Sequence, residues 1–499
     1  MRQRIILGGQ IAVLSLVVLL FVWYRETLAE KFEPIQRLFP KPGTLYPGDG
    51  SRPIPPPASP PTWTPSPIAW KEAGKQEGGG GVGGEQSPDI DHAGVDVEVD
   101  VDDPKTKVLD DIALSDQVRA IFDPADTTFQ RLECPVPKAG LARYEALKSH
   151  SEETTTTATT TESGSIKYFF ALDLTQVVEL LPRLLGSIVE TIRFLGPENC
   201  ALSIVEGNSD DGTNEVLEAI RAEIEALGTE YFFQSSDVNP KDGERIVSLA
   251  KLRNLALQPL LDDSRRYSAQ STVVFLNDVA ICMEDILELV YQRSLLGADM
   301  TCAMDWTYVG RDPTFYDVWI SRTMNGESFF RVPEDRSWDY AWNLFWNDLE
   351  TRNRYSSHLP FQVFSCWNGA VTFTAEPILN RQVSFRGSNP GECFQGEPEL
   401  FCKDLWYKGW NKIAVVPSVN LEYTDERGKD LKSLKGYTST WVGPEQDEKS
   451  KIDWSPNPPD QVKCMEIMEK PDWRPWNETL STASSSDTRR ARAHHWRRS

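Results

Sequence analysis

Positive charge is scarce in this sequence: 52 Lys and Arg stand against 74 Asp and Glu, a formal net charge of −22. Binding to nucleic acid depends on cations that neutralise phosphates, so the composition excludes nucleic acid as the expected partner. Two nucleotide-binding motifs are missing as well, a GxxxxGK(S/T) loop and a GxGxxG motif after an expected strand. The chain has eight cysteines but neither a CxxC spacing nor a Cys/His cluster, so it offers no zinc site.

Only one apolar run is long enough to cross a membrane. Residues 5–24 contain no charge, have about the length that a bilayer core requires of a helix, and follow Arg2 and Arg4. We expect a signal-anchor at residues 5–24, a cytosolic tail at residues 1–4 and a lumenal remainder, with a cleaved signal peptide as the alternative. All eight cysteines would then lie where disulfides are permitted, although their spacing selects no pairing.

The chain then runs through a stem at residues 25–105, which is successively Pro-rich, Gly-rich and acidic. Such sequence cannot bury a core, so we expect it to act as a spacer. A globular domain is expected at residues 106–450, with a disordered Thr-rich insert at 151–165, followed by a C-terminal tail at 451–499.

Within the globular region, strand and helix patterns alternate, which predicts an α/β domain on a largely parallel sheet. Expected strands lie at residues 168–172, 201–205 and 272–276. One helix is expected to start near Leu181 and to end at Gly196, and a second apolar face covers residues 216–227. A third helix is expected at residues 244–258, ending before Pro259.

Acidic residues follow two of the expected strands directly. Glu206 comes after the strand at 201–205, and Asp278 comes after the strand at 272–276. Ligands of open α/β sheets bind beyond the carboxyl ends of strands, so both side chains should face one crevice. Lys251 and Arg253 of the third helix supply cations for a diphosphate, with Arg253 favoured because a guanidinium grips two oxygens. The alternative for each acid is a helix cap or a turn former.

Several motifs in order resemble the fungal capsule-associated α-1,3-mannosyltransferase family, over roughly residues 134–442. The motifs that carry the resemblance are FFAL (169–172), SIVE (203–206), DGT (211–213), LAKLRN (249–254), FLNDV (275–279), FYD (315–317), CWNG (366–369) and LFCKDLW (400–406). The resemblance implies a type II Golgi membrane enzyme with a GT-A-like nucleotide-sugar-binding domain. It also implies a retaining transfer of mannose from GDP-mannose to a mannose-containing glycan, with a divalent cation, Mn²⁺ or Mg²⁺.

The family resemblance also guides the candidate site residues. The Asn277-Asp278 pair stands where GT-A enzymes have a DxD motif, so we assign the metal to Asp278, with one carboxylate available there. A second ligand could come from the acids at 392, 397, 399 and 404 or from the region of Asp305. The assigned residues are: for catalysis, Asp278, Glu399 and Asp404; for the nucleotide and cofactor, Glu206, Asp211, Lys251, Arg253 and Asn277; for the substrate, Asp305, Asp317, Trp367 and Asn368.

Trp367 and Asn368 are chosen because sugars stack on aromatic rings, while an amide offers both a donor and an acceptor to their hydroxyl groups. Other readings of the chain stay open at this point. They are a transferase that uses another nucleotide sugar or inverts the anomeric configuration, and a catalytically inactive head that binds glycans or scaffolds other Golgi enzymes.

Overall fold

The computed structural model describes residues 109–136, 140–148, 166–241, 243–335, 337–466 and 470–480. The expected cytosolic tail, signal-anchor, stem and Thr-rich insert all lie outside these residues. Among the helices that are described, none has the length and apolar character needed to cross a membrane.

A ten-stranded mixed sheet forms the centre of the described fold, with the strand order β3-β2-β1-β4-β9-β5-β10-β8-β7 and with β6 paired to β5. The strands are β1 (Ile166–Leu174), β2 (Cys200–Gly207), β3 (Glu230–Ser236), β4 (Tyr267–Leu276), β5 (Met300–Val309), β6 (Asp312–Phe315), β7 (Arg322–Thr323), β8 (Phe361–Ser365), β9 (Ala370–Thr374) and β10 (Ile413–Leu421). The pairs β3-β2, β2-β1, β1-β4 and β5-β10 are parallel, and β9 runs antiparallel to β4 and β5. The prediction of an α/β domain on a mostly parallel sheet is therefore confirmed.

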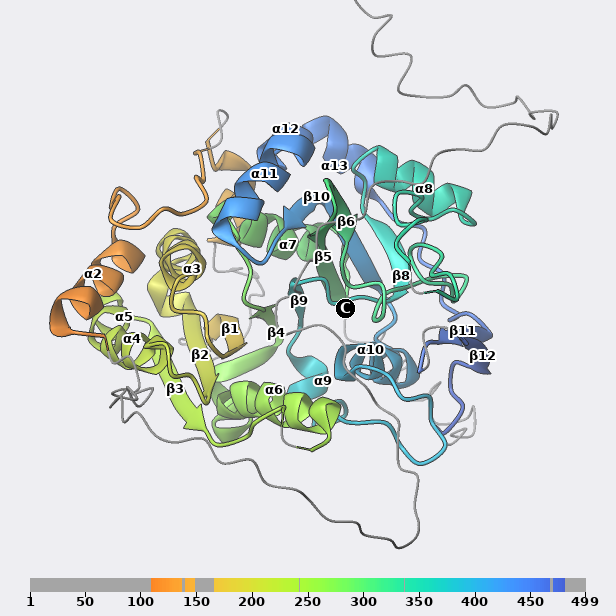
Figure 1. Cartoon of the computed structure of the whole chain (residues 1–499), viewed down its shortest axis with the longest axis horizontal. Helices are drawn as coiled ribbons and strands as arrows, with labels where there is room; N and C mark the ends of the chain where they lie inside the picture. The colour runs from red at the N-terminus through yellow and green to blue at the C-terminus, as the bar shows by residue number, and fades with distance from the viewer. Residues whose placement is uncertain are drawn as a thin grey trace, which may run out of the picture. The chain divides into compact units, whose positions relative to one another are not determined.

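Helices cover both faces of this sheet (Figure 1). They are α2 (Asp111–Phe122), α3 (Leu181–Leu195), α4 (Thr213–Ala219), α5 (Arg221–Leu227), α6 (Arg245–Asp262), α7 (Met283–Leu296), α8 (Leu349–Ser356), α9 (Glu376–Leu379), α10 (Glu397–Lys408), α11 (Asp425–Lys435), α12 (Thr438–Trp441) and α13 (Pro444–Ser450). One core lies between the sheet and α6, α9 and α10, and the other between the sheet and α3, α4, α5 and α7. Side chains alternate between these cores along β1, so Phe169 and Ala171 face α6 while Phe170 faces α3.

The expected helix boundaries are only partly correct. Helix α3 starts at Leu181 with a proline in its first turn and has Gly196 as its C-cap, as predicted. The prediction that the third helix ends before Pro259 is wrong, because α6 continues to Asp262. A proline this close to a helix end removes one backbone hydrogen bond, and burial of Leu260 in the core favours the extra turn.

Six cysteines form disulfides: Cys134–Cys282, Cys302–Cys366 and Cys393–Cys464. Cys200 and Cys402 are buried free thiols. The third disulfide reaches beyond residue 450, where the sequence predicts a tail. A hairpin of β11 (Gln461–Cys464) and β12 (Asp472–Pro475) lies there, so folded structure continues past the expected boundary.

Candidate active site

Carboxylates converge at the carboxyl ends of the parallel strands. Asp173 is the eighth residue of β1, and Asp278 follows β4 by two positions. Leu172 pairs with Leu276 in the register of these neighbouring strands, so the two acids lie at the ends of adjacent strands. Burial raises the pKa of Asp278, and the negative charge of Asp173 adds to the shift, as expected for acids at the ends of adjacent strands. We call the region around these two carboxylates the crevice, after the place beyond the strand ends where open α/β sheets bind ligands.

Arg253 of α6 reaches the crevice from one face of the sheet. Its Nε lies 3.0 Å from Oε1 of Glu397 and 4.0 Å from Oδ2 of Asp173. The guanidinium also lies over the ring of Trp367, 4.5 Å from the ring centre. Arg253 is only 7% exposed, so it is held between two acids and an aromatic ring.

Glu397 occupies the first turn of α10, and a glycine allows this helix to start so close to the core. A Cβ on Gly396 would lie 2.4 Å from Cδ1 of Ile320 and 2.9 Å from the ring of Trp319. Any other residue would therefore have to shift the Ile320 side chain, the Trp319 ring or the first turn of α10.

The crevice holds more negative than positive charge. Burial raises the pKa of Asp278 to about 6, against the lowering effect of Arg253. Burial also raises the pKa values of Asp173 and Glu397, and Arg253 opposes both shifts. One guanidinium group is thus shared by three carboxyl groups. The negative charge that it leaves uncompensated favours a ligand that is a cation or a hydrogen-bond donor.

A second pair of acids lies beside this group. Asp305 of β5 accepts a hydrogen bond of 2.6 Å from the hydroxyl group of Tyr423, and its Oδ1 is buried with no hydrogen-bond partner among the described residues. Asp317 accepts a bond of 2.8 Å from the backbone N–H of Asn368. Burial raises the pKa of Asp317 to about 6, while burial and the Asp317 charge raise the pKa of Asp305 well above its usual range. Asp305 is sealed inside, whereas Asp317 is partly exposed.

The turn between β8 and β9 builds the wall of the crevice. Nε1–H of Trp367 donates to Oδ1 of Asn277 at 3.0 Å, and the N–H of Asn277 donates to the carbonyl oxygen of Gly369 at 2.9 Å. Gly369 has a φ of 81°, and a Cβ there would lie 3.0 Å from Cγ1 of Val279. The turn is therefore fixed against the end of β4.

The two residues of this turn that were assigned to the substrate are buried within the wall. Asn368 is fully buried, accepts from the hydroxyl group of Ser321 and donates to the carbonyl of Ala303. Trp367 is 1% exposed and turns its ring toward Arg253. Both shape the crevice from behind, and their polar groups are already engaged with the protein.

Glu206 and Asp211 behave as turn formers. Glu206 is buried and accepts from the N–H of Ser209 at 2.7 Å. Asp211 accepts from the N–H groups of Val178 and Thr213, each at 3.0 Å. These contacts match the alternative that the sequence left open for acids at such a turn.

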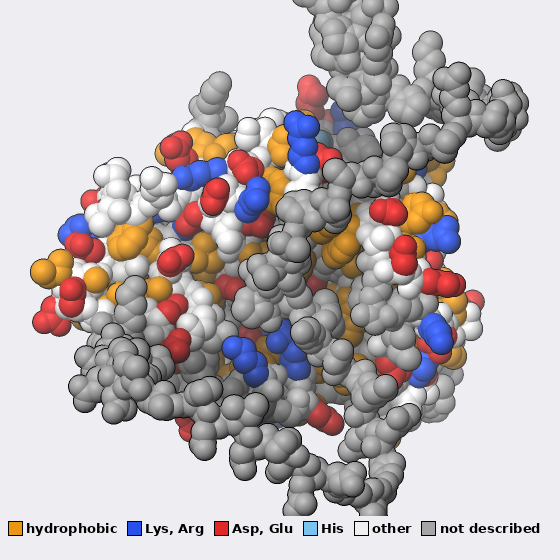
Figure 2. Space-filling view, in the orientation of Figure 1, with side chains coloured by type: hydrophobic (Ala, Val, Ile, Leu, Met, Phe, Trp, Pro, Cys, Tyr) orange, Lys and Arg blue, Asp and Glu red, His pale blue; other side chains and the backbone are white. Residues whose placement is uncertain are grey.

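The cations of α6 differ in exposure. Arg245, at the first position of the helix, and Lys251 are exposed, and Figure 2 shows Lys and Arg side chains over α6 on the face that it draws. Burial raises the pKa values of Tyr316 and Glu397, and the positive charge of Arg245 opposes both shifts, so this exposed cation acts on the crevice. We call the exposed side at Arg245 the mouth of the crevice. Arg253 lies two turns further along and is buried.

Glu399 and Asp404 have their partners elsewhere. The Glu399 carboxylate lies 3.5 Å from Nη2 of Arg322, and burial raises its pKa to about 8. Asp404 accepts two hydrogen bonds from Arg386, at 2.7 and 2.9 Å. Of the three residues assigned to catalysis, Asp278 lies in the crevice. Glu399 and Asp404 instead form ion pairs with Arg322 and Arg386.

Sequence reasoning missed Asp173, Tyr316 and Tyr423, and mentioned Glu397 only as one of several possible ligands. Asp173 carries the signal used for Asp278, since it follows the expected strand at 168–172 directly. Tyr423 follows β10 in the same way. No local signal places Glu397, because its position depends on how α10 packs against α6.

The residues present fit a divalent ion only in part. Within the described part of the chain, no group of three or more His, Cys, Asp or Glu side chains is arranged to hold a metal ion. Asp278 nevertheless follows the end of β4, with Asp173 near the end of the adjacent strand β1. This set suits Mg²⁺ or Mn²⁺, which proteins often bind through one or two carboxylates while the substrate phosphates complete the shell.

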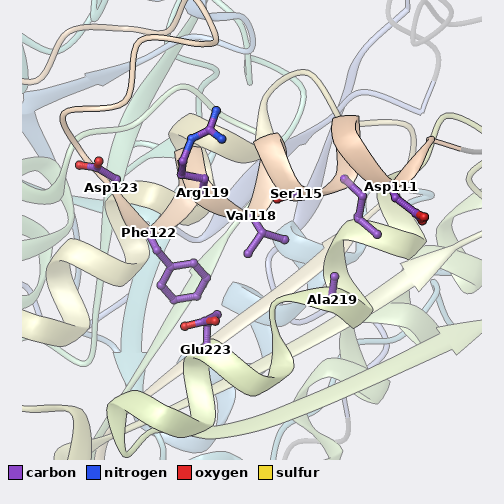
Figure 3. A pocket seen from close by; sticks show the side chains of 9 residues that line it. Asp111, Ser115, Val118, Arg119, Phe122, Asp123, Ala219 and Glu223 are labelled. Atoms are coloured by element: carbon purple, nitrogen blue, oxygen red, sulfur yellow. The ribbon is translucent and has the colours of Figure 1, made fainter.

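A cavity of about 560 Å³ lies away from these residues, between α2 and the helices α4 and α5. In Figure 3, Val118 and Phe122 point from α2 toward Ala219 and Glu223. The residues that line it include no residue assigned to the site from the sequence.

Comparisons with known proteins bear on the same segment. Residues 167–404 match the family model described as Cryptococcal mannosyltransferase 1. The alpha-1,3-mannosyltransferase CMT1 of Cryptococcus neoformans var. neoformans serotype D is 36% identical over 315 residues, which are 60% of this chain and 67% of the relative.

Among solved structures, S. aureus TarS 1-349 is similar at 15% identity and a TM-score of 0.32, over 54% of this chain and 64% of that chain. Its complex with UDP-GlcNAc is similar at 14% identity and a TM-score of 0.31, over 51% and 58%. The match thus spans less than two thirds of these solved chains, and likeness at such TM-scores does not establish a common fold.

Proposed function

The chain belongs to the cryptococcal mannosyltransferase family, and from this premise we propose that it is a retaining α-1,3-mannosyltransferase that moves mannose from GDP-mannose to a glycan. The observation that carries the proposal is the crevice itself. Asp173, Asp278 and Arg253 meet at the carboxyl ends of parallel strands, where α/β sheets bind ligands, inside the segment that matches the family. We propose a GT-A-like mode of nucleotide-sugar binding on this sheet.

We assign different residues around the crevice to different parts of the donor. Arg245 is exposed at the mouth, where a guanidinium can grip the diphosphate through two oxygens. Asp278 would hold the divalent ion, Mn²⁺ or Mg²⁺, which would neutralise the diphosphate as it leaves. Asp278 stands directly after a strand, so its carboxylate is fixed by a rigid element.

The acceptor in this proposal is a mannose-containing glycan. Asp317 and Tyr316 are partly exposed beside the crevice, so we assign them to the acceptor hydroxyl group. Asp305 is sealed behind them, and its hydrogen bond with Tyr423 anchors that wall.

We also propose the topology expected from the sequence, a type II Golgi membrane protein with a lumenal head. Three disulfides among the described cysteines support an oxidising compartment, since cytosolic proteins rarely keep such bonds. The anchor at residues 5–24 lies outside the described residues and remains part of the proposal.

The test is turnover of a panel of nucleotide sugars by the full-length chain in detergent, with a mannose-containing acceptor, with and without manganese. We expect transfer from GDP-mannose, dependence on the cation, and a product with the anomeric configuration of the donor. Preference for another nucleotide sugar would contradict the assigned donor. Binding of glycan without turnover of any donor would instead identify an inactive glycan-binding or scaffolding member of the family.

A further inference from the structure

Arg253 is poorly suited to hold a diphosphate, although its residue type suggests that role. Its guanidinium lies between the carboxylates of Glu397 and Asp173, at 3.0 and 4.0 Å, so the three groups together carry a net negative charge when both acids are ionised. An approaching diphosphate would meet this surplus of negative charge. The exposed Arg245 offers the diphosphate a cation without such partners close by among the described salt bridges.

From this arrangement we propose that Asp173, Arg253 and Glu397 form the subsite that binds the hydroxyl groups of the sugar moiety of the donor. The inference rests on the proposed function, and it assigns to donor-sugar recognition two carboxylates that the sequence did not assign to the substrate. We call these three residues the sugar triad.

The hydrogen-bonding capacity of the sugar triad matches a sugar better than a phosphate. Ionised carboxylates only accept hydrogen bonds, and a phosphate ester oxygen without a proton also only accepts. Sugar hydroxyl groups both donate and accept, so they can donate to Asp173 and Glu397. Nη1 of Arg253 is buried without a hydrogen-bond partner among the described residues, which leaves a donor for a sugar oxygen.

The sugar triad is also rigid, as selective recognition of one sugar requires. Arg253 is backed by the ring of Trp367, and that ring is fixed by its own hydrogen bond to Asn277. Gly396, the residue before Glu397, packs closely against the side chains of Ile320 and Trp319, and this packing sets the position of Glu397. A carboxylate pair held in this way loses little freedom when a ligand binds.

The position of the sugar triad agrees with this role. Asp173 is both a member of the triad and the neighbour of Asp278, so the triad adjoins the proposed diphosphate site. The donor would extend from Arg245 at the mouth, past Asp278, to Arg253 in the interior.

The experiment compares GDP with GDP-mannose by calorimetry at a fixed manganese concentration, on the full-length chain in detergent. Glu397→Gln keeps the size of the side chain and removes its charge, and Asp173→Asn does the same on the opposite side of the guanidinium. We expect Glu397→Gln to weaken binding of GDP-mannose by about tenfold while GDP affinity stays within about twofold, because the lost charged hydrogen bond would be to the mannose, which GDP lacks. Asp173→Asn should likewise weaken binding of GDP-mannose more than binding of GDP.

Two control variants test whether the effect is specific to the sugar triad. Arg245→Ala should weaken GDP and GDP-mannose equally, since both ligands carry the diphosphate. Asp299→Asn removes a carboxyl group whose pKa is also raised by burial, but at the amino end of β5, and should change neither affinity. Melting temperatures of all variants separate loss of binding from loss of folding.

The possible outcomes are distinct. Equal weakening of GDP and GDP-mannose by Glu397→Gln and Asp173→Asn would assign the triad to the diphosphate and overturn the sugar role. If the two variants bind manganese more weakly but keep the ratio of GDP to GDP-mannose affinity of the unmodified chain, the carboxylates belong to the cation site. That result would also overturn the sugar role. If the unmodified chain binds neither ligand, the proposed function itself fails, and the inference fails with it.

Discussion

Glu399 is a buried carboxyl group outside the crevice, and its pKa of about 8 gives a test of its role. In the folded state the group is mostly neutral at pH 7, whereas in the unfolded chain it is ionised above its ordinary pKa of 4.5, so the folded state loses stability as the pH rises from about 4.5 to about 8. We expect Glu399→Gln to be close to the original chain in stability at pH 5 and more stable than it at pH 8, with the difference growing by about 1.4 kcal/mol per pH unit between them. Denaturant unfolding at both pH values measures this, and an identical pH dependence of the two proteins would contradict it.

The catalytic role assigned to Glu399 from the sequence is tested on the same variant. Because its carboxylate faces Arg322, we expect Glu399→Gln to retain GDP-mannose binding. Loss of binding in a variant with an unchanged melting temperature would return Glu399 to the site.

At the level of single residues, sequence reasoning succeeded where a local rule determined the position. Asp278 follows a β-branched strand, and the rule that ligands bind beyond strand ends placed it in the crevice. The rule was equally applicable to Asp173 and was not applied there. It failed for Glu206, because a backbone N–H group within the same turn satisfies its carboxylate. Partners distant in sequence, such as Arg253 and Glu397, become visible only once α6 and α10 are packed together.

At the level of elements, the regular parts of the chain were predictable from periodicity and capping residues, as α3 illustrates. Two errors arose where tertiary packing overrode local signals. Helix α6 continues through Pro259, where Leu260 is buried, and the chain after residue 450 forms a hairpin that Cys464 joins to Cys393. The spacing of eight cysteines selected no pairing, so the sequence could not reveal that hairpin.

The Cys393–Cys464 disulfide closes a loop with a sequence separation of 71 residues. We expect Cys464→Ser to lower the free energy of unfolding by about 2–5 kcal/mol, since the bond restricts the unfolded chain. Denaturant unfolding measures this difference. Cys402→Ser is the control, because Cys402 is a buried free thiol whose replacement removes no disulfide and should cost only a small packing loss. Equal unfolding curves for Cys464→Ser and the original chain would contradict the prediction.

At the level of the whole molecule, the proposed lumenal topology has a direct chemical readout. Asn477-Glu-Thr479 is an N-glycosylation sequon, and Asn477 is partly exposed after β12. We expect the full-length chain expressed in a eukaryotic cell to lose apparent mass on treatment with an endoglycosidase, and Asn477→Gln to abolish the shift. A chain that is membrane-bound but never glycosylated at this site would argue against a lumenal head.

The central claim is that the crevice around Asp278 transfers mannose, and one paired measurement on Asp278→Asn tests it most directly. The substitution keeps the size of the side chain and removes its charge, so manganese-dependent transfer from GDP-mannose should fall about a hundredfold or more. The melting temperature at pH 7 should not fall, because burial already disfavours the charged form of this group and raises its pKa to about 6. That combination is the result we predict, and near-normal transfer by a well-folded Asp278→Asn protein would contradict the account.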